Sequence, residues 1–371
     1  MTVRKDIVVL PGDGIGPEIM REGLNVLRAV ADKYGHEFNC REFPFGAGAY
    51  FEHGTCYPHE TRTAVFQADS VLKGPVGLDG EGRKALQAKG VRLELETIVA
   101  IRRDLDTYAN YRPVVLPLSF ADFSPLKVER LGTGIDIMMI RELTGGNYFG
   151  EKVEGIDTDW AFARDDGVYT RGQVNRIANV AFFEAKKRGS KLTNVSKPNI
   201  MAEGRFWDYL VGEMGKKKYP DVPLQNAIVD NVACQLVINP SQFNGVMLLE
   251  NMQGDIITDQ AGGIIGSLGL MPSACFNLET GKGCFEPAHG SAPTIAGKNI
   301  ANPYSMIGSV AFMLEKSFGL EQEAGDVWNA LESVFAKGYR TAELGGVTEG
   351  KILSTSEFGL KVVNNILGVV A

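Results

Sequence analysis

Two aspartates lie four residues apart in the segment GDIITDQAGG, at Asp255 and Asp259. At this spacing, in a predicted helix, both carboxylates project from one face. They repel each other unless a cation lies between them, although an exposed acidic face near the positive end of the helix dipole is the alternative. Asp230, after the strand-like run NAIV, offers a third oxygen donor. A set made only of carboxylates suits Mg²⁺ or Mn²⁺ rather than zinc.

Arginines form a second group of candidate functional residues. The segment IRRDLDTYANYRP carries Arg102, Arg103 and Arg112, and IMMIRELTGGNYFGE adds Arg141. Because a guanidinium group binds a carboxylate through two parallel hydrogen bonds, several such residues predict a substrate with two or three carboxylates.

Two further side chains could move protons. Tyr148 follows the glycine pair of TGGNY, and Lys197 belongs to the segment VSKPN. A phenol and an amine can both serve in general acid–base catalysis. A core tyrosine and a surface lysine are the alternatives for each residue taken alone.

Short apolar runs alternate with longer amphipathic segments along the chain, which is typical of an α/β fold. Polar residues follow four of the strand-like runs, and since ligands gather at the carboxyl ends of strands, we expect these residues to share one site. They are Arg141, Lys197, Asp230 and Asp255. The length of 371 residues predicts two domains. The absence of a repeat or low-complexity linker favours two domains that share a sheet.

The glycine-rich turn VLPGDGIGPE does not match a dinucleotide-binding fingerprint. After Gly12 and Gly14 the third glycine position is occupied by Pro17, and Gly16 comes one residue early. We therefore expect a site other than a Rossmann site for any cofactor. A second stretch of small residues, FEPAHGSAPTIAGKNIANP, is long enough to wrap backbone amides around a ligand. Its candidate ligand-binding residues are His289, Gly290, Ser291 and Ala292.

The composition excludes several classes of protein. A net charge of −7, with no stripe of basic and aromatic residues, argues against nucleic-acid binding. The first residues contain too short an apolar run for a signal peptide, and no apolar run reaches membrane-spanning length, which predicts a cytoplasmic protein. The five cysteines are odd in number and form no C-x-x-C pair, so neither disulfides nor zinc are indicated.

Taken together, these motifs resemble the isocitrate/isopropylmalate dehydrogenase family of metal-dependent, β-decarboxylating dehydrogenases. The resemblance rests on LPGDGIGPE, LDTYANYRP, IRELTGGNYFGE, SKPN, IVDNVACQLV, GDIITDQAGG, GSLGLMPSA and the HGSAP stretch, which follow one another in family order over nearly the whole length. It implies an α/β fold of isopropylmalate dehydrogenase type, with two domains, a mixed sheet and no Rossmann cofactor site.

The resemblance also implies domain boundaries and a metal site. A large cofactor-binding domain would comprise residues 1–107 and 266–371, and a middle domain, 108–265, would carry the metal and substrate residues and the interface of a homodimer. Asp255 and Asp259 would bind Mg²⁺ or Mn²⁺ together with Asp230 of the other subunit. Tyr148 and the partner subunit's Lys197, acting with Asp230, would transfer protons.

The same resemblance assigns the substrate and cofactor residues. The substrate carboxylates would be held by Arg102, Arg112 and Arg141. The binding site for NAD, or for NADP in its place, would be lined by Asn199, Gly269, Glu286, His289, Gly290, Ser291, Ala292, Thr294 and Asn302. In family members that use NAD, the position of Thr294 is usually an aspartate that binds the adenosine ribose, so this chain departs from the pattern there.

The expected reaction is the oxidative decarboxylation of a 3-alkylmalate, first of all 3-isopropylmalate in leucine biosynthesis. Ile98 and Val99 stand where relatives that act on tricarboxylates place polar or basic residues, and an apolar pair favours an alkyl group over a third carboxylate. The segment LKGPVG looks more like the isocitrate branch. The alternatives are another 2-hydroxy acid (isocitrate, D-malate, tartrate or a different 3-substituted malate) and a non-catalytic regulatory subunit.

Overall fold

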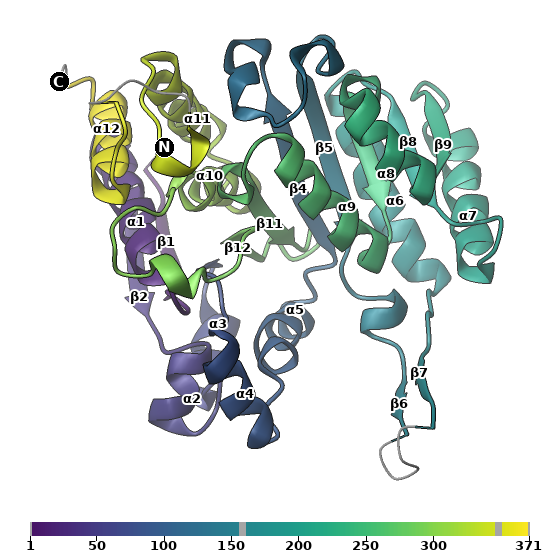
Figure 1. Cartoon of the computed structure of the whole chain (residues 1–371), viewed down its shortest axis with the longest axis horizontal. Coiled ribbons are helices and arrows are strands. Elements are labelled where there is room, and N and C mark those ends of the chain that lie inside the picture. Colours follow the sequence, from purple (N-terminus) through teal and green to yellow (C-terminus); the bar gives the residue numbers. More distant parts are fainter. Residues whose placement is uncertain (1, 156–160, 346–350, 370–371) are drawn as a thin grey trace. The chain divides into compact units, whose positions relative to one another are not determined.

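The computed structural model describes residues 2–155, 161–345 and 351–369. The chain divides into two compact units (Figure 1). Unit 1 comprises Met1–Thr107 and Gly266–Ala371, and unit 2 comprises Tyr108–Ile265.

Five strands of unit 1 run in the order β2, β1, β3, β12 and β11. Their bounds are Glu37–Glu42, Arg4–Leu10, Ser70–Lys73, Gly283–Pro287 and Pro272–Phe276. Neighbours are parallel except β11, which is antiparallel to β12. The second half of β1, Ile7 to Leu10, is fully buried, as expected of a parallel strand covered on both faces.

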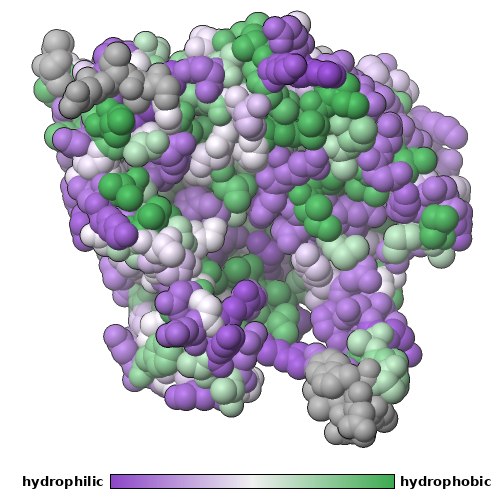
Figure 2. Space-filling model, in the orientation of Figure 1, coloured by the Kyte–Doolittle hydropathy of each residue, from purple (hydrophilic) through white to green (hydrophobic). Residues whose placement is uncertain are grey.

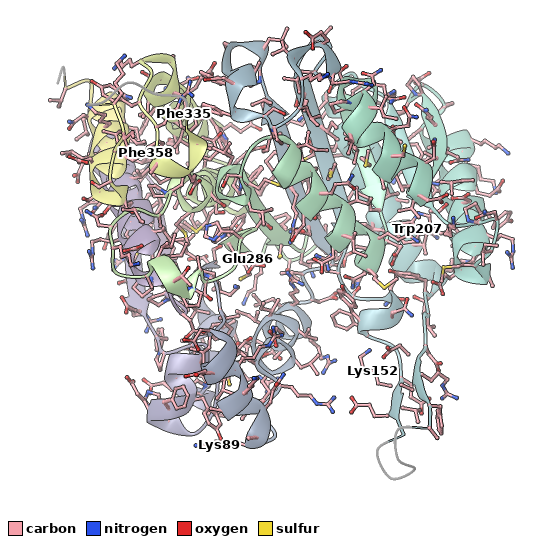
Figure 3. All side chains as sticks on the ribbon, in the orientation of Figure 1. Lys89, Lys152, Trp207, Glu286, Phe335 and Phe358 are labelled. Carbon is pink, nitrogen blue, oxygen red and sulfur yellow. The ribbon has the colours of Figure 1, made fainter. Side chains whose placement is uncertain are left out.

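Helices of unit 1 pack against one another through apolar side chains. Four of them are α1 (Gly16–Tyr34), α10 (Tyr304–Phe312), α11 (Glu321–Ala336) and α12 (Thr355–Leu367). Phe335 of α11 and Phe358 of α12, labelled in Figure 3, have ring centroids 5.6 Å apart. Ser354 starts α12 with a capping box, in which its hydroxyl and the Glu357 carboxylate each bind the other's backbone amide.

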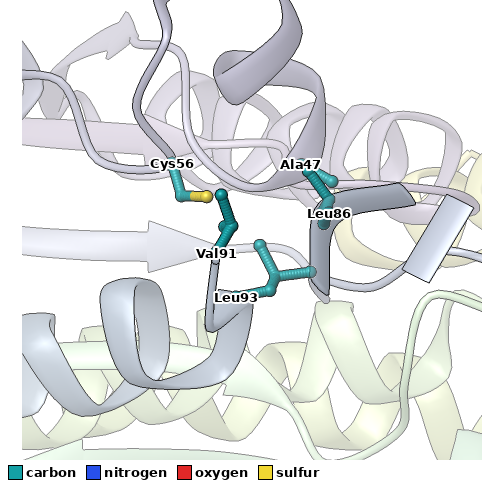
Figure 4. Packing of buried hydrophobic residues seen from close by; sticks show 5 residues of the cluster. All are labelled: Ala47, Cys56, Leu86, Val91 and Leu93. Carbon is teal, nitrogen blue, oxygen red and sulfur yellow. The ribbon is translucent and has the colours of Figure 1, made fainter. Parts of the chain in front are cut away.

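A small separate cluster supports the segment that carries Arg102. Three short helices, α2 (Ala47–His53), α3 (His59–Gln67) and α4 (Gly80–Ala88), lead to a π-helical turn, Leu95–Val99, and to α5 (Ala100–Asp104). The buried side chains of this part form the cluster shown in Figure 4, made of Ala47, Cys56, Leu86, Val91 and Leu93.

Unit 2 is built on five strands in the order β4, β5, β10, β8 and β9. Their bounds are Ala109–Leu116, Ile135–Glu142, Gly245–Leu249, Leu192–Ser196 and Leu224–Ile228. β4 is antiparallel to β5 and the remaining pairs are parallel. The α-helices of the unit are α6 (Arg171–Lys187), α7 (Ala202–Lys218), α8 (Val229–Ile238) and α9 (Asn251–Ile264). Two further strands, β6 (Lys152–Glu154) and β7 (Ala163–Asp165), pair antiparallel as a separate two-stranded sheet.

The predicted α/β class is confirmed. The strand-like runs DIVVLPG, SVLKGPVG, RPVVLPL, IDIMMIREL, LTNVSKPN, NAIVD and GVMLLENMQGD overlap β1, β3, β4, β5, β8, β9 and β10 in that order. The expected positions after strands differ in detail. Asp230 lies in the first turn of α8, because β9 ends at Ile228. Asp255 lies inside α9, the helix expected from its spacing to Asp259, because β10 ends at Leu249. Arg141 lies within β5, and only Lys197 directly follows a strand, β8.

Apolar side chains remain exposed on α8 and α9 of unit 2. Val237 and Ile238 of α8 are 44% and 40% exposed, and Ile256 of α9 is 62% exposed. In Figure 2, hydrophobic surface mixes with hydrophilic surface on the face where these helices lie. Within the described ranges, no helix is long and apolar enough to span a membrane.

Candidate active site

Helix α9 carries the two aspartates and begins at a side-chain cap. The carboxylate of Glu250 accepts hydrogen bonds from the backbone amides of Met252 at 3.0 Å and Gln253 at 2.6 Å. These amides have no partner inside a helix, so the cap fixes where α9 starts. Asp255 and Asp259 then project from one face of the helix, as their spacing predicted.

Buried arginines from the strands face these aspartates. Arg141 of β5 is 1% exposed; one of its terminal nitrogens pairs with Asp255, and the other donates to Asn251 Oδ1 at 2.8 Å. Arg112 of β4 donates from Nη1 to Asp259 Oδ1 at 3.0 Å and to Thr258 Oγ1 at 2.6 Å. Both guanidinium groups are therefore held against α9.

Tyr148 lies at the end of the short 3₁₀ helix Gly146–Tyr148 and reaches the same aspartate as Arg141. Its hydroxyl donates to Asp255 Oδ2 at 3.0 Å, and the Arg141 guanidinium lies 5.8 Å from its ring centroid. Burial raises the pKa of Tyr148, and the negative charge of Asp255 raises it further. The phenol is therefore kept in its protonated form, which can donate a proton.

The donor set on α9 suits a hard divalent cation. Burial raises the pKa of Asp259, the charge of Asp255 also raises it, and Arg112 opposes the change. A cation between the two carboxylates would relieve this repulsion. Within residues 2–155, 161–345 and 351–369, no three His, Cys, Asp or Glu side chains form a complete metal-binding group. The carboxylates that this face of α9 presents are those of Asp255 and Asp259.

Lys197 and Asp230 form a separate pair in unit 2. The Lys197 ammonium contacts Asp230 Oδ1, with side chains 25% and 68% exposed. This hydrogen bond is the main cause of a lowered Asp230 pKa. Gly204 of α7 lies against the backbone of Lys197, since a Cβ there would stand 2.7 Å from the Lys197 carbonyl carbon. The lysine backbone is thus fixed while its amine stays accessible.

Unit 1 contains a buried group of charges around Glu286 of β12, labelled in Figure 3. Its carboxylate pairs with the ammonium of Lys73, which is 2% exposed, and accepts from Arg102 Nη2 at 3.2 Å. Burial would raise the pKa of Glu286, but the charges of Lys73 and Arg102 hold it at about 2. Glu286 therefore fixes Arg102 at the end of α5.

The helix that carries Ile98, Val99 and Arg102 contains a π-turn. Four buried side chains recur every four residues along it, at Leu93, Thr97, Ile101 and Leu105. This spacing exceeds the 3.6 residues of an α-turn, so a wider turn keeps all four on one side. The Thr97 hydroxyl donates to the Leu93 carbonyl at 2.5 Å. Ile98 and Val99 lie off this stripe and are half-buried.

The GDGIG turn packs against the HGSAP loop. The amide of Ile15 donates to the Ser291 carbonyl at 2.8 Å, and a Cβ on Gly14 would stand 2.0 Å from that oxygen. Gly14 also has a φ of +59°, so both space and backbone conformation require glycine. Ala292 has a φ of +39°, a strained value for a residue with a side chain. Burial lowers the pKa of the neighbouring His289.

Asn302 and Gly269, two of the predicted cofactor-binding residues, are linked through hydrogen bonds to Glu343 and Ser267. Glu343 Oε1 accepts from Asn302 Nδ2 at 3.1 Å and from Ser267 Oγ at 3.0 Å, and the Ser267 hydroxyl in turn accepts from the Gly269 amide at 2.9 Å. By contrast, three predicted cofactor residues are exposed: Asn199, Gly290 and Thr294. The Gly290 carbonyl lies 2.8 Å from His289 Nδ1.

Several residues at these sites escaped prediction from sequence. Lys73 ends the apolar strand SVLK, and a lysine inside such a run was the available signal. Glu250 and Asn251 precede GDIITDQ, and their capping role had a signal in the acidic residue before a helical run. Tyr169 and Glu343 carried no sequence signal, because their partners lie far away along the chain.

Comparison with known proteins agrees with this fold. The family model described as isocitrate/isopropylmalate dehydrogenase matches residues 6–362. A 3-isopropylmalate dehydrogenase of Carboxydothermus hydrogenoformans is 44% identical, covering 98% of this chain and 95% of that protein. One from Thermotoga maritima is 43% identical, covering 95% and 96%. The crystal structure of isocitrate dehydrogenase from Methylococcus capsulatus superposes with a TM-score of 0.83 at 29% identity, covering 98% and 99%.

The family model and the named relatives identify the chain as a dehydrogenase. The chain belongs to the isocitrate/isopropylmalate dehydrogenase family.

Proposed function

We propose that this enzyme catalyses the NAD-dependent oxidative decarboxylation of a 3-alkylmalate, with 3-isopropylmalate as the first substrate to test. The observation that carries the proposal is the face of α9, where Asp255 and Asp259 meet Arg141, Arg112 and Tyr148. It is supported by relatives named 3-isopropylmalate dehydrogenase at 43–44% identity over nearly the whole chain. In leucine biosynthesis the product would be 2-oxoisocaproate.

Each chain contributes named groups to this reaction. Asp255 and Asp259 would hold Mg²⁺ or Mn²⁺ together with Asp230 of a second copy, so the active form would be a homodimer. Carboxylate binding is assigned to Arg102, Arg112 and Arg141. When bound, the divalent cation supplies Lewis-acid polarisation of the substrate oxygens, and NAD supplies the hydride acceptor.

The protons are assigned to two side chains. The partner subunit's Lys197, acting with Asp230 and in its neutral amine form, accepts the proton of the C2 hydroxyl as the C2 hydride departs to NAD. Loss of the β-carboxylate as CO₂ leaves its bonding electrons on C3. The Tyr148 hydroxyl, kept protonated by its surroundings, then delivers a proton to that carbon.

Ile98 and Val99 are the residues assigned to the alkyl group of the substrate. Both are apolar and half-buried, so a third carboxylate placed against them would lose hydration without gaining a partner. NAD remains the preferred cofactor, although Thr294 brings no negative charge that would repel the 2′-phosphate of NADP.

Isocitrate is the second candidate substrate. The segment LKGPVG, which contains the buried Lys73, looks more like the isocitrate branch of the family.

A parallel assay separates these possibilities. Reduction of NAD⁺ and NADP⁺ would be followed with 3-isopropylmalate, isocitrate, D-malate and tartrate, with Mn²⁺ present and again after chelation. We expect chelator-sensitive turnover of 3-isopropylmalate with NAD⁺. Faster turnover of isocitrate would transfer the proposal to the second candidate. Turnover of none, restored by a second co-purifying chain, would instead indicate a regulatory subunit.

A further inference from the structure

Tyr169 is a buried residue for which the proposed reaction has no role. It lies just before α6 and is 8% exposed. Its ring packs edge-on against Trp207 of α7, with centroids 5.2 Å apart; Trp207 is labelled in Figure 3. This contact fixes the ring on one side, and its hydroxyl and opposite face contact two other segments of unit 2.

The hydroxyl of Tyr169 forms hydrogen bonds with the residues at the N-terminus of α9. It donates to Glu250 Oε2 at 3.0 Å and accepts from the Asn251 amide at 2.9 Å. The same Glu250 carboxylate accepts from the amides of Met252 and Gln253. One phenol therefore orients the cap of the helix, about one turn before Asp255.

The ring of Tyr169 supports the glycine pair that precedes Tyr148. A Cβ on Gly145 would stand 2.5 Å from Tyr169 Cε1, and one on Gly146 would stand 2.5 Å from its hydroxyl oxygen. The two glycines are thus required for the backbone to lie directly on the ring. Tyr148 follows two residues after Gly146.

A third link joins the same two segments. Asn251, whose amide binds the Tyr169 hydroxyl, donates from Nδ2 to the Gly145 carbonyl at 3.1 Å and accepts from Arg141 at 2.8 Å. The start of α9, the glycine pair and Arg141 therefore all meet at positions fixed by the Tyr169 phenol. Burial raises the pKa of Tyr169 and the charge of Glu250 raises it further, so the phenol stays protonated and keeps both hydrogen bonds.

We propose that Tyr169 is a positioning residue that fixes where Tyr148 and Asp255 lie relative to each other. The inference rests on the proposed function, since it assigns proton transfer to Tyr148 and metal binding to Asp255. A displacement of about 1 Å between reacting groups can lower a rate about 100-fold. Residues that orient metal ligands typically change metal affinity about 10- to 100-fold when they are lost.

Tyr169→Phe tests the inference because it removes only the hydroxyl. Tyr219→Phe is a matched control: Tyr219 is also 8% exposed, its hydroxyl donates to Asn179 at 2.8 Å, and its ring stacks on Phe182. Both variants lose one buried hydroxyl in unit 2. We expect similar losses in melting temperature. Only Tyr169→Phe should weaken Mn²⁺ binding roughly tenfold and lower kcat roughly tenfold, with a smaller change in the substrate KM.

Mn²⁺ binding would be measured by titration calorimetry on the dimer without substrate, and kcat on whichever substrate of the assay panel turns over. The calorimetric measurement does not depend on which substrate the enzyme uses. A wrong substrate assignment can therefore be distinguished from a wrong role for Tyr169. Equal Mn²⁺ affinity and kcat in the two variants would overturn the inference.

Gly145→Ala provides a second test from the other side of the contact. Its φ of −130° is open to alanine, but the added methyl must separate the backbone from the Tyr169 ring. The inference predicts the same combined loss of Mn²⁺ affinity and kcat. An unchanged enzyme would show that the contact does not position the site.

Discussion

Arg112 and Asp259, which are 147 residues apart in the sequence, are joined by a hydrogen bond of 3.0 Å between Nη1 and Oδ1. The pair ties β4 to the face of α9 that also carries Asp255. Asp259 remains half exposed, at 52% of its side chain. One carboxylate oxygen can therefore hold the arginine while the group still faces a ligand.

Asp259→Asn should weaken Mn²⁺ binding at least tenfold, because an amide oxygen brings no charge to the cation. Asp136→Asn is the control. Asp136 also accepts from an arginine, Arg188 at 2.5 Å, and its side chain is 60% exposed, but it lies on β5 away from α9. Calorimetric titration of both variants checks the prediction, and equal Mn²⁺ affinities would remove Asp259 from the metal site.

Glu286→Gln should destabilise unit 1 at neutral pH by about 3–5 kcal/mol, because it leaves the buried Lys73 without its counter-charge. The pKa of Glu286 is about 2 in the fold, against 4.5 for an ordinary glutamate. A carboxyl group whose pKa is lower in the folded state than in the unfolded state stabilises the fold at pH values above its unfolded pKa. This stabilisation is lost as the pH falls from about 4.5 towards 2.

Urea unfolding at pH 7, 5, 4 and 3 would measure this difference between the wild type and the variant. We expect it to be largest at pH 7 and to shrink at the two lowest pH values. A difference that stays constant over the whole range would show that the charge of Glu286 does not contribute in this way.

Ile98→Ser should lower the preference for 3-isopropylmalate over isocitrate, since it removes apolar surface assigned to the alkyl group. A change of about tenfold in the ratio of the two kcat/KM values is expected from the burial of one aliphatic side chain. Leu95→Ser, on the same π-turn but 38% exposed, is the control. A ratio that moves equally in both variants would argue against a pocket at Ile98.

Val237→Asp should dissociate the proposed homodimer, because it places a charge in the exposed apolar surface of α8. Light scattering after gel filtration should show a monomer, and turnover should be lost with the partner subunit's Lys197. Val128→Asp alters another exposed valine of unit 2, 57% exposed, and should leave the dimer intact. A Val237→Asp variant that remains dimeric would place the interface elsewhere.

The parts of the fold that sequence reasoning predicted are those set by local pattern. Asp255 and Asp259 share a helix face because their spacing alone determines it, and the strands β1 and β5 each contain a continuous apolar run, IVVL and IMMI. β2 was missed because its sequence, EFNCRE, is polar at an exposed sheet edge, and β11 and β12 were missed because PSACF and GCFEP contain no β-branched residue.

The contacts that link distant segments could not be predicted in the same way. Lys73 and Glu286 meet because β3 and β12 are neighbours in the sheet, which no local pattern encodes. The π-turn before Arg102 is similar: its four-residue spacing of buried side chains is visible in the sequence only after the burial of Thr97 is known. Strand order and tertiary packing decide these features.

The most direct test of the proposed activity is the reaction of the purified protein with 3-isopropylmalate, NAD⁺ and Mn²⁺. NADH would be followed by absorbance and released CO₂ would be trapped in the same sample. We predict equal amounts of NADH and CO₂, and no reaction after chelation. NADH without CO₂, or turnover that persists without a divalent cation, would contradict the account.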